Sequence, residues 1–361
     1  EQALTVADWI ERIGAQFAGA DLHFGHGTDN ARDEAAWLVL HVVGAPLDGS
    51  FGDWGRVVEP AEAADIRRLA DARCSSGSPL AYLLGLARFA GLEFEVTPDV
   101  LVPRSPIAEL ILDGFRPWCD FSPLRGRQPR VLDMCTGCGC IAIATAHYLP
   151  RVQVDAVDIS RAALEVAARN VRRHGVADRV RLIRSDLFQS LPACRYDLIL
   201  ANPPYLPQGG LPGLPPEYGS EPSLGLASGA DGLDAVLEIL VRAPDYLADD
   251  GILVCEVGES EGRLAAEPWY AKLDENAREQ YRVSGRALLQ GLIHALNSSG
   301  EQAVAEAEAL GYEYASRGRR YGLSSVEAAH ALLFFRNVLI ESVVKVYREA
   351  NVPSVRAWEE R

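Results

Sequence analysis

The chain has 361 residues, 48% of them hydrophobic, which is enough for two or three domains with well-filled cores. Its formal net charge of −15 disfavours direct binding to nucleic acid, because a phosphate backbone is held by clustered Lys and Arg, and it favours a basic protein partner. No apolar run reaches 18 residues and no basic start precedes an apolar core, so we expect a cytoplasmic protein without a membrane span.

Residues 1–78 are predicted to form a small helical bundle. Apolar residues such as Trp9 and Ile13 recur at spacings of three and four in three stretches. Asn30 is the candidate cap of the second helix, and Pro60 marks the start of the third. We assign to this bundle the recruitment of a substrate. The alternative is that it merely covers the catalytic domain.

Residues 79–100 are expected to join the bundle to the catalytic domain. The pattern predicts a short helix over 79–85 and a β-hairpin over 89–96, followed by an extended segment that enters a helix over 107–115. Arg104, just before that helix, either lies near the substrate or is simply exposed.

Residues 101–266 form the predicted catalytic domain, in which strands alternate with helices. We expect a strand that ends at 131–132, further strands at 153–158, 180–183, 196–201 and 251–257, and helices at 141–148, 162–174 and 233–243. This alternation specifies a parallel, doubly wound sheet, and such sheets bind ligands beyond the carboxyl ends of their strands.

A glycine-rich turn follows the first of these strands. Gly137 and Gly139 allow the backbone to turn sharply and to approach a ligand. Asp158 ends the next strand, 25 residues after Asp133, where a parallel βαβ unit places a carboxylate that holds the hydroxyls of a ribose. The expected ligand is a nucleoside-type cofactor, and the alternative is a turn that only packs a helix.

The cofactor candidates are gathered at strand ends. Asp186 and Leu187 follow the third strand and are the candidates for the adenine edge, although each acid in the set is also a possible helix cap. The full set is Asp133, Cys135, Thr136, Gly137, Gly139, Asp158, Ile159, Asp186, Leu187 and Asn202.

The fourth strand runs directly into Asn202-Pro203-Pro204-Tyr205. An amide nitrogen is a poor nucleophile because its lone pair is delocalised, so an enzyme that methylates it needs two acceptors for its N–H bonds. The Asn202 side-chain carbonyl and the Pro203 backbone carbonyl are the candidates, and Tyr205 can stack on the flat amide. The alternative is a turn that merely ends the strand.

The seven cysteines form no disulfide framework, since their number is odd and they are scattered along the chain. Cys135, Cys138 and Cys140 lie inside the glycine turn, and no second Cys or His pair has ligand spacing. We therefore expect no metal site.

The ordered motifs resemble the Rossmann-like S-adenosylmethionine-dependent methyltransferases, and residues 30–265 resemble the protein-glutamine N5-methyltransferases. The branch that acts on large-subunit ribosomal protein three is the most similar. The release-factor branch usually has an acid where this chain has Pro106. The motifs that carry the resemblance are Leu101-Val102-Pro103-Arg104-Ser105-Pro106-Ile107, Asp133-Met134-Cys135-Thr136-Gly137-Cys138-Gly139-Cys140-Ile141, Glu221-Pro222-Ser223-Leu224-Gly225-Leu226-Ala227 and Gly229-Ala230-Asp231-Gly232-Leu233-Asp234.

The resemblance implies methylation of a glutamine side chain in a ribosomal protein, with S-adenosylmethionine as cofactor and S-adenosylhomocysteine as product. Three alternatives stay open: a release-factor glutamine methyltransferase, a nucleic-acid adenine N6-methyltransferase acting on a flipped base, and a fusion or regulatory protein with an inactive catalytic domain.

Residues 267–361 depart from the family, which continues with two further strands. The pattern here predicts helices over 281–296 and 302–310, and a capping box at Ser324 and Glu327 that opens a helix to about Tyr347. We expect an all-α module of unknown role whose apolar faces pack on one another or on a second copy of the chain. The alternative is that its helices replace the missing strands and lie against Ile252 and Leu253 at the edge of the sheet.

Overall fold

The structure, a computed structural model, describes residues 3–116, 119, 121, 128–230, 232–256, 268–273, 320, 323–324 and 326–327. The chain forms two compact units, Glu1–Val257 and Gly258–Arg361. The predicted helices 281–296 and 302–310 lie outside the described residues, as does most of the helix expected after Ser324. No helix in the described part of the chain is both long and apolar enough to cross a membrane.

In the second unit the structure describes one short helix, α11 (Pro268–Ala271), and the predicted capping box. The Ser324 hydroxyl donates to the Glu327 carboxylate at 2.8 Å, and the Glu327 N–H donates back to the Ser324 hydroxyl at 3.3 Å. The start of a helix at this point is therefore confirmed.

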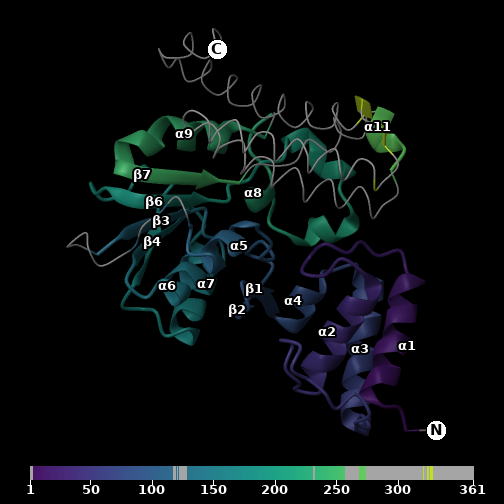
Figure 1. Cartoon of the computed structure of the whole chain (residues 1–361). Coiled ribbons are helices and arrows are strands. Elements are labelled where there is room, and N and C mark those ends of the chain that lie inside the picture. Colours follow the sequence, from purple (N-terminus) through teal and green to yellow (C-terminus); the bar gives the residue numbers. More distant parts are fainter. Residues whose placement is uncertain are drawn as a thin grey trace. The chain divides into compact units, whose positions relative to one another are not determined.

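The first unit begins with three helices, α1 (Val6–Ala18), α2 (Ala31–Val42) and α3 (Pro60–Ser76) (Figure 1). The Asn30 side chain accepts the Asp33 N–H at 2.9 Å, which confirms the predicted cap of α2. Trp9 and Ile13 are buried among the three helices, as their spacing predicts.

A connecting region follows, made of α4 (Leu80–Leu84), the antiparallel hairpin β1 (Leu86–Phe89) and β2 (Leu92–Glu95), and α5 (Ile107–Leu112). The predicted end of α5 at Phe115 was wrong. The backbone turns left-handed at Gly114 and Phe115, and the Phe115 N–H donates to the Leu110 carbonyl at 2.8 Å, so the helix closes with a reversal.

The catalytic region is a five-stranded sheet in the order β5-β4-β3-β6-β7, with every pair parallel. This is the expected Rossmann-like order. The chain starts at β3, adds β4 and β5 on one side of it, and then adds β6 and β7 on the other side. The strands are β3 (Arg130–Met134), β4 (Gln153–Asp158), β5 (Val180–Arg184), β6 (Tyr196–Ala201) and β7 (Leu247–Cys255), and the main crossover helices are α6 (Cys140–Tyr148), α7 (Arg161–Arg173) and α9 (Asp234–Tyr246).

Both faces of this sheet are covered. The helices α6 and α7 lie on one side of the sheet and α9 on the other (Figure 1). Val131 and Leu198 belong to the core cluster that includes residues of α6 and α7, whereas Leu132 and Ile199 pack with Ile239 of α9. β4 and β6 are mostly apolar and largely buried, interrupted by Asp155 and Asp197, and both have the predicted bounds. The carboxyl ends of the strands are left free to form the site.

Candidate active site

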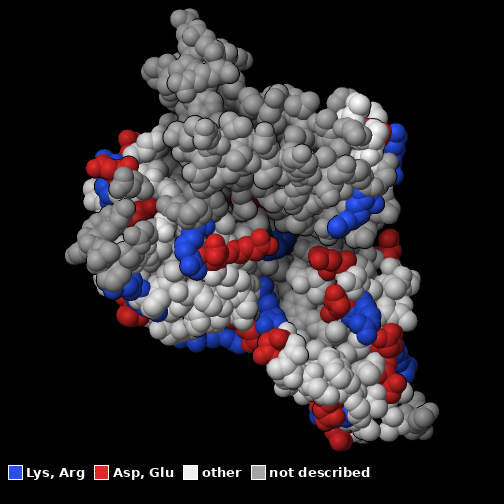
Figure 2. Space-filling view, viewed as in Figure 1, with Lys and Arg blue, Asp and Glu red and all other residues white. Residues whose placement is uncertain are grey.

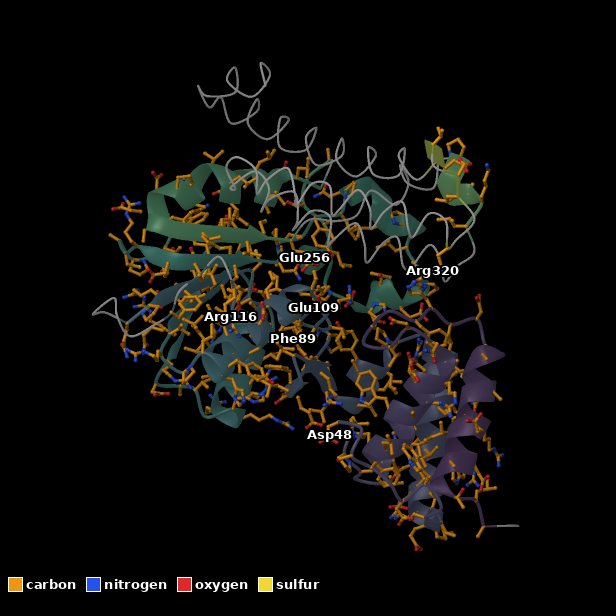
Figure 3. The ribbon with its side chains drawn as sticks, viewed as in Figure 1. Asp48, Phe89, Glu109, Arg116, Glu256 and Arg320 are labelled. Atoms are coloured by element: carbon orange, nitrogen blue, oxygen red, sulfur yellow. The ribbon has the colours of Figure 1, made fainter. Side chains whose placement is uncertain are left out.

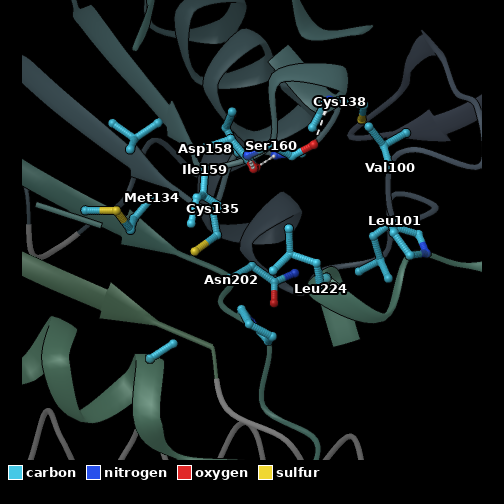
Figure 4. Close-up of a pocket in the computed structure, with 18 of the residues that line it drawn as sticks. Val100, Leu101, Met134, Cys135, Cys138, Asp158, Ile159, Ser160, Asn202 and Leu224 are labelled. Carbon is cyan, nitrogen blue, oxygen red and sulfur yellow. Dashed lines mark hydrogen bonds between the residues drawn. The ribbon is translucent and has the colours of Figure 1, made fainter. Parts of the chain in front are cut away.

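A cavity of about 350 Å³ lies at the carboxyl ends of β3, β4, β5 and β6 (Figure 4). Its volume is in the range of small-molecule sites. Most of the predicted cofactor residues line it, whereas Asp133 and Gly139 do not. Of the predicted catalytic residues Asn202 and Pro204 line it, whereas Pro203 and Tyr205 are not among its lining residues. The lining residues that the sequence indicated are Cys135, Thr136, Gly137, Asp158, Ile159, Asp186, Leu187, Asn202 and Pro204.

The two glycines of the turn after β3 have different roles. Gly137 has φ +57°, and a Cβ built on it meets nothing within 4 Å. Without a side chain at this position, the cavity wall consists of bare backbone that a ligand can approach closely. Gly139 has φ +85°, and a Cβ there would lie 3.1 Å from the Ile143 side chain and 3.3 Å from Ala167. Gly137 therefore serves the ligand side of the turn, and Gly139 serves the packing of α6 on α7.

Asp133 lies behind the turn rather than in the cavity wall. It is fully buried, and its Oδ2 accepts hydrogen bonds from the Thr136 hydroxyl and, at 3.1 Å, from the Ala142 N–H. Within the described part of the chain its Oδ1 has no hydrogen-bond partner. Burial raises the pKa of Asp133 to about 7. Asp133 thus shapes the glycine turn from inside.

Asp158, the last residue of β4, faces the cavity from the other side of the turn. Its Oδ2 accepts the Gly137 N–H at 2.8 Å and its Oδ1 accepts the Ser160 N–H at 2.9 Å (Figure 4). Burial raises the pKa of this carboxyl. A carboxylate has about four lone-pair sites, so both oxygens can still accept hydroxyl donors from a ligand.

Next to Asp158 the cavity wall becomes apolar. Ile159 is 43% exposed although it is a large hydrophobic residue, and it lines the cavity together with Leu187. The backbone at Leu187 is left-handed, with φ +42°, and the Asp186 carboxylate accepts the Gln189 side-chain amide at 3.0 Å. Apolar surface beside acceptor groups suits a flat heterocycle with exocyclic N–H groups.

The Asn-Pro-Pro-Tyr turn begins directly after β6, and Figure 4 shows the Asn202 side chain extending into the cavity. The Tyr205 hydroxyl donates to Glu256 Oε1 at 3.3 Å, and the Ser105 hydroxyl donates to Glu256 Oε2 at 2.5 Å. Figure 3 places Glu256 at the end of β7. Burial raises the pKa of Tyr205, so its phenol stays protonated and able to donate.

The methyltransferase small domain family matches residues 121–210. The ribosomal protein uL3 glutamine methyltransferase of Bordetella pertussis is 46% identical over 266 residues, which cover 74% of this chain and 88% of that protein. The protein of the same name from Xanthomonas campestris pv. campestris is 51% identical over 263 residues, which cover 72% and 83%. The chain belongs to the ribosomal protein uL3 glutamine methyltransferase family.

Among solved structures, the hMettl16 catalytic domain in complex with MAT2A 3′UTR hairpin 6 is 16% identical, with a TM-score of 0.37, over 62% of this chain and 79% of that one. The curated relatives cover 72 to 74% of this methyltransferase, which confirms that a part of the chain departs from the family. The cofactor of the enzyme is S-adenosylmethionine. The carboxylate of Asp158 and the open backbone at Gly137 fit a nucleoside of this kind.

Arg104 of this methyltransferase is part of the cavity wall and not the exposed residue of the alternative interpretation. Its guanidinium forms two hydrogen bonds with Glu221, at 2.7 and 2.6 Å, and lies over the Tyr218 ring. Glu221 also accepts the Val102 N–H at 3.0 Å and lies 3.4 Å from His26. Burial alone would raise the pKa of Glu221, but its contacts with His26 and Arg104 hold that pKa at about 2.

A second buried ionic group joins the bundle to the segment that follows the Asn-Pro-Pro-Tyr turn. Arg73 of α3 bonds to Glu34 of α2 at 2.6 Å and to Glu217 at 3.1 Å, and Glu217 also accepts the His23 N–H at 2.8 Å. Glu217 lies in the short helix η3 (Pro216–Ser220). No sequence pattern indicated this group, because its members are scattered singly along the chain.

Proposed function

We propose that this enzyme transfers a methyl group from S-adenosylmethionine to the side-chain amide nitrogen of a glutamine in ribosomal protein uL3. The observation that carries this proposal is that Asn202 lines the same cavity as Asp158 and Gly137. An amide held at Asn202 therefore shares one enclosed space with a nucleoside held at Asp158. The names of the curated relatives support the choice of substrate.

On the cofactor side, Asp158 would accept hydrogen bonds from the two ribose hydroxyls, because each of its oxygens accepts only one backbone N–H and keeps a further lone pair. Ile159 and Leu187 would contact the faces of the adenine, and Asp186 would accept a hydrogen bond from its exocyclic amine. When bound, S-adenosylmethionine supplies a methyl carbon on a positively charged sulfonium. Cys135, Thr136 and Gly137 lie along the same wall and complete the contact with the cofactor.

On the substrate side, the Asn202 side-chain carbonyl and the Pro203 backbone carbonyl accept hydrogen bonds from the two N–H groups of the glutamine amide. This arrangement would turn the nitrogen lone pair toward the methyl carbon, and positioning of this kind lowers a barrier by several kcal/mol. Pro203 and Pro204 have no N–H to compete for these acceptors. Tyr205, oriented by its bond to Glu256, stacks on the flat amide. No strong base is needed, because the nitrogen becomes acidic once methylated.

A basic protein partner agrees with the charge of the chain. Figure 2 shows a row of acidic side chains, with basic side chains beside it, across the middle of one face, where Figure 3 places Glu109 and Arg116. Arg116 lies 4.0 Å from Asp113. Glu109 and Asp113, both on or next to α5, are exposed. Together with the net charge of −15, these residues favour a cationic substrate surface over a nucleic acid.

We assign roles to the rest of the chain on the same basis. Residues 1–78 are the substrate-recruiting bundle, 79–100 the connection, 101–266 the catalytic domain and 267–361 a helical module of unknown role, for which association with a second copy is one candidate. The contact between Arg73 and Glu217 supports the first assignment, since it ties the bundle to the segment that borders the cavity.

The test is methyl transfer from labelled S-adenosylmethionine to purified uL3, with the modified residue located by mass spectrometry. We expect a gain of one methyl group on a glutamine of uL3. A release factor and an adenine-containing hairpin serve as comparison substrates. Labelling of either one at a higher kcat/KM than uL3 would overturn the substrate assignment, and labelling of none would overturn the proposed activity.

A further inference from the structure

One segment holds the Asn-Pro-Pro-Tyr turn in place from its far side. We call it the strap, residues 226–230 and 232. The Leu206 N–H donates to the Leu226 carbonyl at 2.9 Å, and the Ser228 N–H donates to the Leu206 carbonyl at 3.0 Å. The Gln208 N–H donates to the Gly229 carbonyl at 3.0 Å. The strap therefore pairs, like a short strand, with the residues that immediately follow Tyr205.

Gly232 makes the closest approach between the strap and the turn. A Cβ built on Gly232 would lie 2.3 Å from the Tyr205 carbonyl oxygen, 2.9 Å from its carbonyl carbon and 3.0 Å from that of Leu206. These atoms are all backbone, so no flexible side chain can move out of the way. The φ of Gly232 is +83°, which also favours glycine. Only glycine lets the strap lie this close to Tyr205.

We propose that Gly232 is a positioning residue for methyl transfer: its bare α-carbon lets the strap fix the backbone at Tyr205, and thereby the two amide acceptors at Asn202 and Pro203. This inference rests on the proposed function of those acceptors. Pro203 and Pro204 each have a φ locked by the ring. Because only ψ can rotate at each proline, less of a displacement of Tyr205 is absorbed between Tyr205 and Asn202 than in a turn without prolines.

The strap is itself anchored beside the cavity. The Ser228 hydroxyl accepts the Ala235 N–H of α9 at 2.9 Å, and Ser228 is 9% exposed. Ala227 and Ser228 both line the cavity. The strap is thus fixed on one side to α9 and on the other to the turn. None of the hydrogen bonds described above joins the strap to Asp158 or to the glycine turn. Its effect falls on the substrate side of the site.

The test compares Gly232→Ala with Gly49→Ala. Gly49 has φ +84°, and a Cβ on it meets nothing within 4 Å, so this control imposes the same backbone strain without a clash. We expect kcat of Gly232→Ala to fall about a hundredfold, the loss typical of an acceptor misplaced by about 1 Å. The dissociation constant for S-adenosylhomocysteine, measured by calorimetry, should stay within about twofold of wild type.

Ser228→Ala is the second variant, because it loosens the strap without a clash and does not put folding at risk. We expect a smaller fall in kcat, about tenfold, again with unchanged cofactor affinity. The proposal is overturned if folded Gly232→Ala turns over like Gly49→Ala, or if cofactor affinity falls in step with kcat. Should Gly232→Ala not fold, a wild-type kcat in Ser228→Ala overturns it. Failure of the proposed function is distinct, because wild-type enzyme would then not methylate uL3.

Discussion

The guanidinium of Arg73 lies 3.1 Å from the carboxylate of Glu217, although the two residues are 144 positions apart in the chain. Each side chain is only 1% exposed, and Arg73 also bonds to Glu34 at 2.6 Å. A buried pair of this kind contributes little to stability as a whole, but removal of one partner leaves uncompensated charge in the interior. The pair therefore fixes how the bundle meets the segment after the catalytic turn.

Arg73→Leu should lower the free energy of unfolding by about 3 to 5 kcal/mol, because Glu34 and Glu217 would remain buried without their cation. Urea denaturation followed by tryptophan fluorescence measures this loss. Arg32→Leu is the matched control, since the pair of Arg32 with Glu11 is 68% and 65% exposed. The control should lose no more than about 1 kcal/mol. Equal losses in the two variants would contradict the interpretation.

Asp158→Ala should weaken S-adenosylhomocysteine binding by about 1.5 to 3 kcal/mol, the range for hydrogen bonds to a charged group. The reason is that Asp158 faces the cavity with both oxygens. Calorimetry gives the dissociation constant directly. Asp178→Ala is the control, because the Asp178 side chain is 76% exposed. An unchanged constant for Asp158→Ala would remove this residue from the cofactor site.

Asp133→Asn should change how stability depends on pH. The folded pKa of Asp133 is about 7, above the value of 3.8 for the unfolded chain, so the folded state holds the proton more tightly. Wild-type enzyme therefore loses stability between about pH 4 and pH 7 through this group, by an amount on the order of 4 kcal/mol. Asparagine keeps an acceptor for Thr136 and Ala142 but does not titrate.

The measurement for Asp133 is the difference in unfolding free energy between wild type and Asp133→Asn as a function of pH. We expect that difference to shift in favour of the variant as the pH rises from 4 to 7 and to stay level above that. A difference that is flat across the whole interval would show that the carboxyl ionises as readily in the folded enzyme as in the unfolded chain.

Local sequence patterns predicted the sheet and the cavity well. β4 and β6 have the expected bounds, because each is a mostly apolar segment that ends at Asp158 or just before Asn202. The bounds of β7 were wrong, since the strand expected over 251–257 spans Leu247–Cys255. The glycine turn was also predictable from the sequence, because few residue types adopt the backbone angles that it requires. Strand ends of a parallel sheet meet at one edge, so the candidates at those ends were brought together by topology alone.

Other features depend on residues that are distant in the sequence. The residues next to Arg73 in the sequence do not indicate that Glu217 lies beside it. Those next to Gly232 do not indicate that its α-carbon lies against the Tyr205 backbone. Asp133 was predicted as a cofactor residue because it ends the strand, yet its carboxylate turns inward to hold Thr136. The direction of a single side chain is set by packing that the local pattern does not contain.

The central claim is that Asn202 orients the glutamine amide, and the most direct test is methyl transfer to uL3 by Asn202→Ala with calorimetry on the same protein. The account predicts that S-adenosylhomocysteine binds with its wild-type affinity within about twofold, since Asp158 is untouched and the Asn202 side-chain carbonyl is assigned to the substrate amide, although Asn202 also lines the cofactor cavity. It also predicts that kcat falls about a hundredfold or more, because the substrate nitrogen loses a positioning acceptor. Turnover close to wild type in this variant would contradict the mechanism.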